Sequence, residues 1–164
     1  MPKTIAQIIT KDENIKSLDY PFQNLIKEGN KFFKNDEHKM NIRIQNLHDI
    51  IDVFKENNIV CWPQGKTLLG IYKYKKLIKN DTDEDIGTSI NNLELVCEKI
   101  LPKLIEKGFK IIRATKNNSM VSLLRNYRYV DICFFKIKDN YIGYEHKKFP
   151  IRFYQDFENL TINN

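Results

Sequence analysis

Carboxylates at alternate positions follow closely after a small-residue turn in the middle of the chain. The turn reads Gly65-Lys66-Thr67-Leu68-Leu69-Gly70, and the acidic segment reads Asp81-Thr82-Asp83-Glu84-Asp85-Ile86-Gly87. On a β-strand, the side chains at 81, 83 and 85 would all point to one face. Crowded carboxylates raise one another's pKa, and a divalent cation removes that cost. The segment therefore predicts a site where a metal ion lies beside a nucleotide phosphate.

One further aspartate stands in an apolar segment where a lone carboxylate is costly to bury. Asp131 lies within Tyr129-Val130-Asp131-Ile132-Cys133-Phe134-Phe135. Either a metal ion or a hydrogen-bonding partner must offset the cost of burying it. The alternative to a metal role is an ion pair with the neighbouring Arg125 or Arg128. For the acidic segment at 81–85, the alternative is a solvated turn.

Two familiar phosphate and calcium loops do not fit this region. Gly65-Lys66-Thr67 looks like the end of a Walker A loop, but that motif needs a glycine where this chain has Val60. The aspartates at 81, 83 and 85 look like the start of an EF-hand loop. That loop needs glycine and glutamate where this chain has Ile86 and Asn92. Both motifs are therefore rejected.

The spacing of apolar residues predicts the elements that must position these side chains. Leu47, Ile50, Ile51 and Phe54 give the apolar face of a helix over 42–57, and a second helix is expected over 93–105, ending at Gly108. Short apolar runs predict strands over 59–62, 109–115, 120–124, 129–135 and 141–144. This order indicates an α/β (α+β) fold, a mixed sheet with helices packed on one side. We expect one domain, with a core at 41–164 and an N-terminal helical segment at 1–40 packed on it.

These parts match a polymerase-β-type nucleotidyltransferase site: a strand, a glycine turn opening a helix, D-x-D on the next strand, and a later carboxylate. More specifically, 65–73, Leu77-Ile78 and 81–87 resemble the LicD/fukutin family. Members typically read G-G-T-L-L-G-x-x-R, then D-x-D-x-D-I-G after a short segment. The Val-Asp-Ile around Asp131 is similar to a later strand of that family. The resemblance extends roughly over 42–160.

The resemblance implies transfer of a phospho-alcohol group that depends on Mg²⁺ or Mn²⁺. Donors in the family are typically CDP-activated, such as CDP-choline or CDP-ribitol, and acceptors are sugar hydroxyls of a glycan. Carried over to this chain, Asp83 and Asp85 would be catalytic metal ligands, and Asp131 the third carboxylate. That third group would also accept the proton of the acceptor hydroxyl.

The resemblance also implies which residues hold the donor. Gly65 and Thr67, at a helix start, would bind donor phosphates, and Lys73 stands where the family commonly has arginine. Lys66 replaces the second glycine of the family motif, so it either contacts phosphate or blocks the site. Because many members continue beyond the point where this chain ends, a partner chain or a second copy is a candidate to complete the site.

Three other functions remain open at this point. The same fold transfers nucleotidyl groups from an NTP to protein, RNA or small molecules. A degenerate member would be a binding or assembly module, which Lys66 favours and the three retained carboxylates oppose. A plain nucleic-acid-binding domain predicts aromatic residues interleaved with basic ones. Only residues 125–129 show that pattern, so nucleic acid is the less favoured partner.

Composition sets the remaining limits. With 27 Lys and Arg against 21 Asp and Glu, the net charge is +6, which attracts anions in general and selects none of them. Cys61, Cys97 and Cys133 are far apart, so we expect reduced thiols rather than a zinc site. No apolar run approaches the roughly 20 residues of a membrane span, and the N-terminus lacks the apolar stretch of a secretory signal. These observations predict a cytoplasmic protein.

Overall fold

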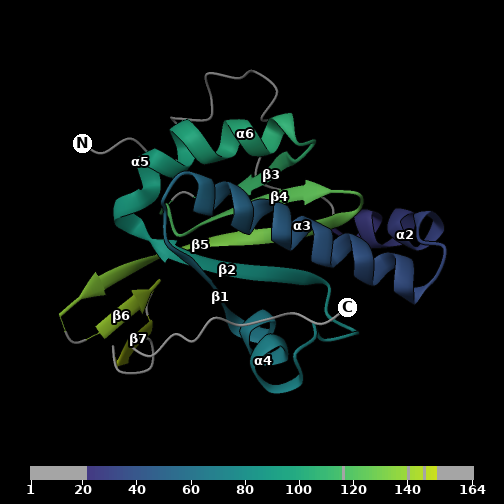
Figure 1. The fold of residues 1–164 in the computed structure, drawn as a ribbon, viewed down its shortest axis with the longest axis horizontal. Coiled ribbons are helices and arrows are strands. Elements are labelled where there is room, and N and C mark those ends of the chain that lie inside the picture. The colour runs from purple at the N-terminus through teal and green to yellow at the C-terminus, as the bar shows by residue number, and fades with distance from the viewer. Residues whose placement is uncertain (1–21, 116, 140, 146, 151–164) are drawn as a thin grey trace.

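Seven strands form one mixed sheet in the computed structural model, which describes residues 22–115, 117–139, 141–145 and 147–150 (Figure 1). The strands are β1 (Cys61–Pro63), β2 (Asp83–Ser89), β3 (Lys110–Ala114), β4 (Met120–Arg125), β5 (Arg128–Lys138), β6 (Tyr141–Tyr144) and β7 (Lys147–Pro150). Five of them follow the order β1-β2-β5-β4-β3, while β6 pairs with the end of β5 and β7 with β6. The long β5 therefore joins the main sheet to this small extension.

The sheet is mixed because β2 and β5 run parallel, whereas the other neighbours are antiparallel. Parallel neighbours need a long crossover connection, and here the crossover contains the second helical region together with β3 and β4. The predicted α+β fold with a mixed sheet is confirmed.

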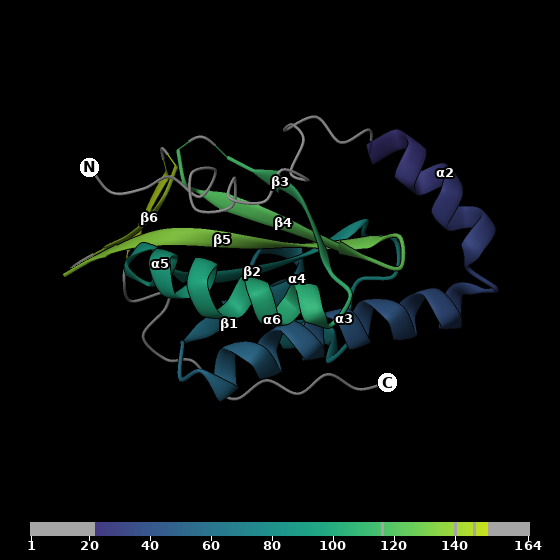
Figure 2. The same ribbon diagram turned by 90° about the horizontal axis from the view of Figure 1, so that it is seen from above.

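Helices cover one face of the sheet. The layer consists of α3 (Asp36–Glu56) and a helical run made of η1 (Ile90–Asn92), α5 (Leu93–Leu95), η2 (Val96–Ile100) and α6 (Leu101–Glu106). Figure 2 shows α3 and the α5–α6 run on the same side of the strands. The main core fills the space between this layer and the sheet, and includes Leu47, Ile50, Phe54, Val96, Ile100, Leu104, Val121, Leu123, Val130 and Ile132. Burying these apolar side chains is what holds the two layers together.

Helix α3 begins six residues earlier than the apolar pattern predicted. Asn35 caps its first turn, since the Asn35 side-chain oxygen accepts a hydrogen bond from the His38 backbone N–H at 2.7 Å. Such a cap satisfies a donor that the helix itself leaves free. The predicted end is confirmed, because Asn57 is the C-cap and Asn58 follows with a positive φ of 55°.

The second helix contains one wide turn that the sequence pattern did not show. Residues Val96–Ile100 form a π-helical turn, which is followed by Leu101 and Pro102. Proline has no N–H to continue the regular hydrogen bonding, and π-helical structure occurs mostly as single turns inside α-helices. Gly108 then ends the run with φ +88°, as predicted.

Strand β1 is displaced from its expected position. The apolar run predicted a buried strand over 59–62, but β1 spans Cys61–Pro63 and the Val60 side chain is 72% exposed. The Ile59 backbone N–H bonds to the Phe54 carbonyl at 3.0 Å. Ile59 therefore belongs to the end of α3, which delays the start of the strand.

The N-terminal part described by the structure is helix α2 (Phe22–Phe32). Leu25 is buried, and the Phe32 ring lies 5.0 Å from the Tyr127 ring in the turn between β4 and β5. The first 21 residues of the expected N-terminal helical segment lie outside the described residues. The division into 1–40 and 41–164 stays a prediction, and α3 crosses it. Within the described residues, no helix has the length and apolar character that a bilayer crossing requires.

Candidate active site

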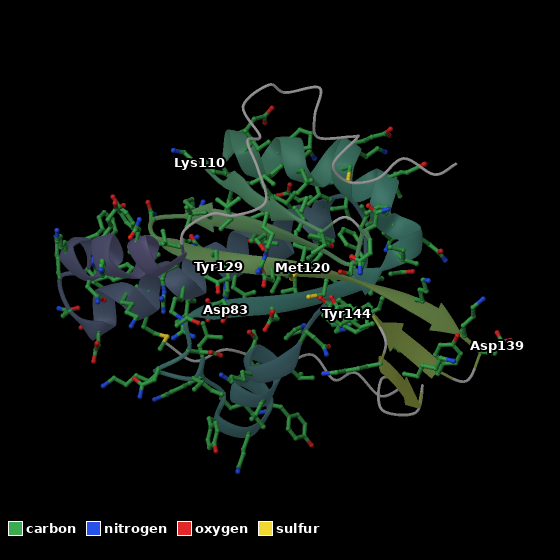
Figure 3. The ribbon with its side chains drawn as sticks, turned by 180° about the vertical axis from the view of Figure 1, so that it is seen from behind. Asp83, Lys110, Met120, Tyr129, Asp139 and Tyr144 are labelled. Atoms are coloured by element: carbon green, nitrogen blue, oxygen red, sulfur yellow. The ribbon has the colours of Figure 1, made fainter. Side chains whose placement is uncertain are left out.

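The register between β2 and β5 brings three carboxylates to one face of the sheet. Asp85 is paired with Asp131, and Asp83 with Tyr129. Paired residues on neighbouring strands share a face, as do residues two apart on one strand, so the three aspartates project together. One carboxylate oxygen from each lies within 4.8 Å of the others. Figure 3 shows this face, opposite the helical layer, with Asp83 and Tyr129 labelled.

Asp85 is the least compensated of the three groups. Burial raises its pKa to about 7, and the negative charges of Asp83 and Asp131 add to the effect. The ion pairs found among the described residues leave Asp85 without a cationic partner. A carboxylate in this environment binds either a proton or a cation near neutral pH.

Asp131 has two donors of its own. The Arg113 Nη2 lies 2.8 Å from Asp131 Oδ2, and the Ser122 hydroxyl donates to Asp131 Oδ1. Burial raises the pKa of Asp131, while Ser122 and Arg113 oppose that rise. The expected alternative partners were wrong, because the Arg125 guanidinium lies 2.5 Å from Asp49 and the Arg128 guanidinium donates to the Asp81 carbonyl.

The glycine turn lies directly against the carboxylates. Gly65 opens helix α4 (Gly65–Tyr74) with φ +56°, and a Cβ added there would lie 3.3 Å from Asp85 Oδ2. The side chain of the N-cap residue, Gln64, makes no capping hydrogen bond to the amide groups of the first turn. These amides carry the partial positive charge that attracts phosphate at a helix start.

Two hydrogen bonds fix this helix start to β2. The Gln64 backbone N–H bonds to the Asp85 carbonyl at 2.9 Å, and the Asp85 N–H bonds to the Thr67 hydroxyl oxygen at 2.9 Å. Thr67 is buried, with 3% of its surface exposed. Its hydroxyl oxygen therefore supports the backbone of a site residue, a structural contact that the sequence did not reveal.

Among the ion pairs of the described residues, neither lysine named from the sequence is paired with a carboxylate of the cluster. The Lys66 side chain is 70% exposed, and its Nζ lies 3.3 Å from Asp81 Oδ1. Asp81 precedes β2 and is not one of the three clustered carboxylates, so the strand alternation expected for 81, 83 and 85 applies to Asp83 and Asp85 only. Lys73 is exposed in the last turn of α4, at the opposite end from Gly65, with its Nζ above the Tyr74 ring.

Glu84 points to the other face, as strand alternation predicted, and meets a buried arginine from the helical layer. Arg43 Nε and Nη2 both donate to Glu84 Oε1, at 2.8 and 2.5 Å. Arg43 Nη1 also donates to the Ile78 carbonyl at 2.8 Å. Arg43 and Glu84 side chains are each only 1% exposed. This pair anchors the strand that carries Asp83 and Asp85, and sequence reasoning missed it.

An aromatic group borders the cluster at the other end of β2. The Trp62 indole lies over Gly87, since a Cβ at Gly87 would be 2.4 Å from Trp62 Nε1. The Trp62 and Phe135 rings are 5.6 Å apart, and Phe135 and Tyr144 are 5.0 Å apart. Gly87 is thus required for this close approach, which explains a glycine that ends the acidic motif.

The donor set suits a hard divalent cation. All three candidate ligands are carboxylate oxygens, which Mg²⁺ and Mn²⁺ prefer over softer metals such as Zn²⁺. The described histidines and cysteines contribute no ligand to this cluster. The residues present therefore fit the metal ion that the sequence resemblance implied.

Comparisons with known proteins identify the family of this chain. A family model described as LicD/FKTN/FKRP, nucleotidyltransferase domain, matches residues 58–163. The chain is also 29% identical over 129 residues to an uncharacterized protein of Rickettsia typhi (strain ATCC VR-144 / Wilmington). That similarity covers 78% of this chain and 40% of the relative, so the chain spans less than half of that relative's length. On the family match, which includes all three aspartates and the glycine turn, the chain belongs to the LicD/FKTN/FKRP family.

Proposed function

We propose that this protein transfers a phospho-alcohol group from a CDP-activated donor to a hydroxyl of a glycan, with Mg²⁺ or Mn²⁺ bound at the three aspartates. The observation that carries the proposal is the convergence of Asp83, Asp85 and Asp131 beside the start of α4. Membership of the LicD/FKTN/FKRP family supports the same reaction class.

In this proposal the three carboxylates have different tasks. Asp83 and Asp85, two residues apart on β2, act as metal ligands, and Asp131 completes the set from β5. A divalent ion held there supplies positive charge where negative charge develops during phosphoryl transfer. Asp131 also takes the proton of the acceptor hydroxyl, with Ser122 and Arg113 holding its carboxylate in place.

The donor diphosphate is proposed to lie at the first turn of α4. Gly65 brings this turn within contact distance of Asp85, so phosphates bound at the helix start also reach the metal ligands. Lys66 does not block this approach, because its side chain extends toward Asp81. Lys73 as a phosphate contact stays a prediction, and its place at the far end of α4 gives it no support.

The reaction is a substitution at one phosphorus atom. The acceptor oxygen forms a bond to the phosphorus that carries the alcohol, and the diphosphate P–O bond breaks. CMP leaves with the bridging oxygen, and the hydroxyl proton moves to Asp131. The protein contributes mainly by positioning the reactants and by stabilising the charge that develops on the phosphate.

A ligand panel tests the proposal. Mg²⁺ or Mn²⁺ together with CDP-choline, CDP-ribitol or CTP should raise the melting temperature, equivalent to about 2.7 kcal/mol at a hundredfold excess over Kd. Asp83→Ala with Asp85→Ala should abolish the shift. Asp81→Asn is the matched control, because Asp81 belongs to the same acidic segment but not to the cluster, and it should keep the shift.

The products distinguish the competing functions. CMP release with a glycan acceptor supports the proposed transfer, whereas pyrophosphate release from an NTP would indicate nucleotidyl transfer. No shift with any nucleotide would overturn the transferase proposal in favour of an assembly module. A shift with single-stranded RNA alone, unaffected by the aspartate changes, would indicate a nucleic-acid-binding domain.

A further inference from the structure

Arg113 places a permanent positive charge against one member of the carboxylate cluster. Its Nη2 lies 2.8 Å from Asp131 Oδ2, and its Nε donates to the Ser122 hydroxyl oxygen at 2.9 Å. The same hydroxyl donates to the other oxygen of Asp131. Since a guanidinium does not lose its proton in proteins, this charge is a fixed part of the site. Each Asp131 oxygen still has a lone pair for a metal ion.

The backbone of β3 is shaped to bring Arg113 to this face. Ile111 pairs with Leu123, but Arg113 pairs with Ser122, because the register shifts by one residue between them. Without that shift Arg113 would lie opposite Val121, whose side chain is fully buried in the core beneath the helical layer. A bulge of this kind re-aims a side chain. Here it aligns Arg113, Ser122 and Asp131 in one row across three strands.

The other cations near the motif are engaged elsewhere. The Lys66 ammonium contacts the Asp81 carboxylate, and the Arg128 guanidinium donates to the Asp81 carbonyl. Arg43 is buried with Glu84 on the opposite face. Among the ion pairs of the described residues, Arg113 with Asp131 is the one that reaches the cluster.

We propose that Arg113 limits the cluster to one divalent cation until the donor's phosphates supply the charge for a second. When all three carboxylates are ionised, as metal ligands are, they carry −3 and their ion-pair partner Arg113 adds +1, so these four side chains carry −2 and are neutralised by a single dication. A second dication would leave +2 in a half-buried site, which is unfavourable. A bound diphosphate brings at least two further negative charges. This inference rests on the metal site of the proposed function and adds the order in which ions and donor bind.

Counting bound Mn²⁺ on the full chain tests the inference. We expect the wild-type protein to bind one Mn²⁺ alone and two in the presence of CDP, measured by isothermal titration and by the EPR signal of free Mn²⁺. Arg113→Gln removes the charge, so it should bind a second Mn²⁺ without CDP, or bind the first at least about tenfold more tightly. Arg113→Lys keeps the charge and should bind one ion, as the wild type does.

Ser122→Ala separates charge from hydrogen bonding. It removes one donor to Asp131 and leaves every charge in place, so the number of ions should not change. A purely structural role for Arg113 predicts instead that Ser122→Ala and Arg113→Gln weaken Mn²⁺ binding alike, which would overturn the inference. Circular dichroism checks that each variant is folded.

The outcomes separate this inference from the proposed function. If Arg113→Gln binds Mn²⁺ with wild-type stoichiometry and a Kd within about twofold of wild type, the role of Arg113 is wrong and the metal site stands. If the wild-type protein binds two ions without CDP, the inference also fails, even where Arg113→Gln does not fold. If the wild-type protein binds no Mn²⁺ with or without CDP, the metal-dependent function itself is wrong.

Discussion

Asp85 and Asp131 are direct neighbours across β2 and β5, yet they have different electrostatic environments. Asp131 accepts hydrogen bonds from Arg113 and Ser122. Burial, followed by the negative charges of Asp83 and Asp131, raises the pKa of Asp85 to about 7. In the metal-free protein, Asp85 therefore carries the main electrostatic penalty of the site.

The stability of the metal-free protein should depend on this group. The folded-state pKa of Asp85 lies above its ordinary value of 3.8, so the native state holds an extra proton between about pH 4 and pH 7. Stability then falls as the pH rises through that window. Asp85→Asn removes the charge and should raise the melting temperature in EDTA at pH 8, with little effect at pH 5.

Thermal melts of wild type and Asp85→Asn at both pH values check this. Asp139→Asn, an exposed change just after the end of β5, is the control for removing a carboxylate that lies away from the cluster. An equal change in melting temperature at pH 5 and pH 8 would show that Asp85 does not titrate between them.

At the scale of elements, the site depends on how α4 is joined to β2. Thr67 accepts the Asp85 N–H, and the Gln64 N–H bonds to the Asp85 carbonyl. The backbone N–H and the backbone carbonyl of Asp85 are thus both hydrogen-bonded to residues at the start of α4. Gly65, with its positive φ, lets that turn come close enough to make these bonds.

Thr67→Val tests this junction. Valine keeps the shape of the side chain but leaves the Asp85 N–H without its partner, so the free energy of unfolding should fall by about 1–3 kcal/mol. Thr67→Ser keeps the oxygen and loses one methyl group, at a cost of about 1 kcal/mol or less. Urea denaturation measures both. If serine costs as much as valine, the packing of the methyl group matters and the hydrogen bond does not.

At the scale of the whole molecule, the helical layer packs on the face of the sheet opposite the three aspartates and contacts the strand that carries two of them. The Arg43 guanidinium, from α3, donates to the Glu84 carboxylate of β2. It also donates to the carbonyl of Ile78, which precedes the acidic segment. Burial raises the pKa of Glu84, and Arg43 opposes that rise. The arrangement couples the packing of the layers to the position of the strand that carries Asp83 and Asp85.

Removing one member of this buried pair should be costly. Arg43→Ala leaves Glu84 buried without its partner and should lower the free energy of unfolding by about 3–5 kcal/mol. Arg43→Met combined with Glu84→Leu fills the space with apolar groups and should cost much less. Chemical denaturation of the two variants makes the comparison, and a double variant as unstable as Arg43→Ala would contradict it.

Much of the fold could be predicted because it depends on local patterns. The apolar period located α3, the second helix and most strands, and the glycine turn was correctly placed at the start of a helix. Errors occurred where one element extends into another. Strand β1 begins later than predicted because the Ile59 N–H bonds to the Phe54 carbonyl at the end of α3. Helix α3 begins earlier than predicted because Asn35 caps its first turn.

Local geometry alone determined that Asp83 and Asp85 share a face and that Glu84 lies on the other, because side chains alternate along any strand. The resemblance to known proteins predicted that Asp131 would join them. Only the tertiary structure decided which groups surround these carboxylates, since pairing between distant strands and a one-residue bulge set those contacts. A shift of one residue turns a side chain to the opposite face, so neither Arg113 beside Asp131 nor Arg43 beside Glu84 could be derived from spacing along the chain.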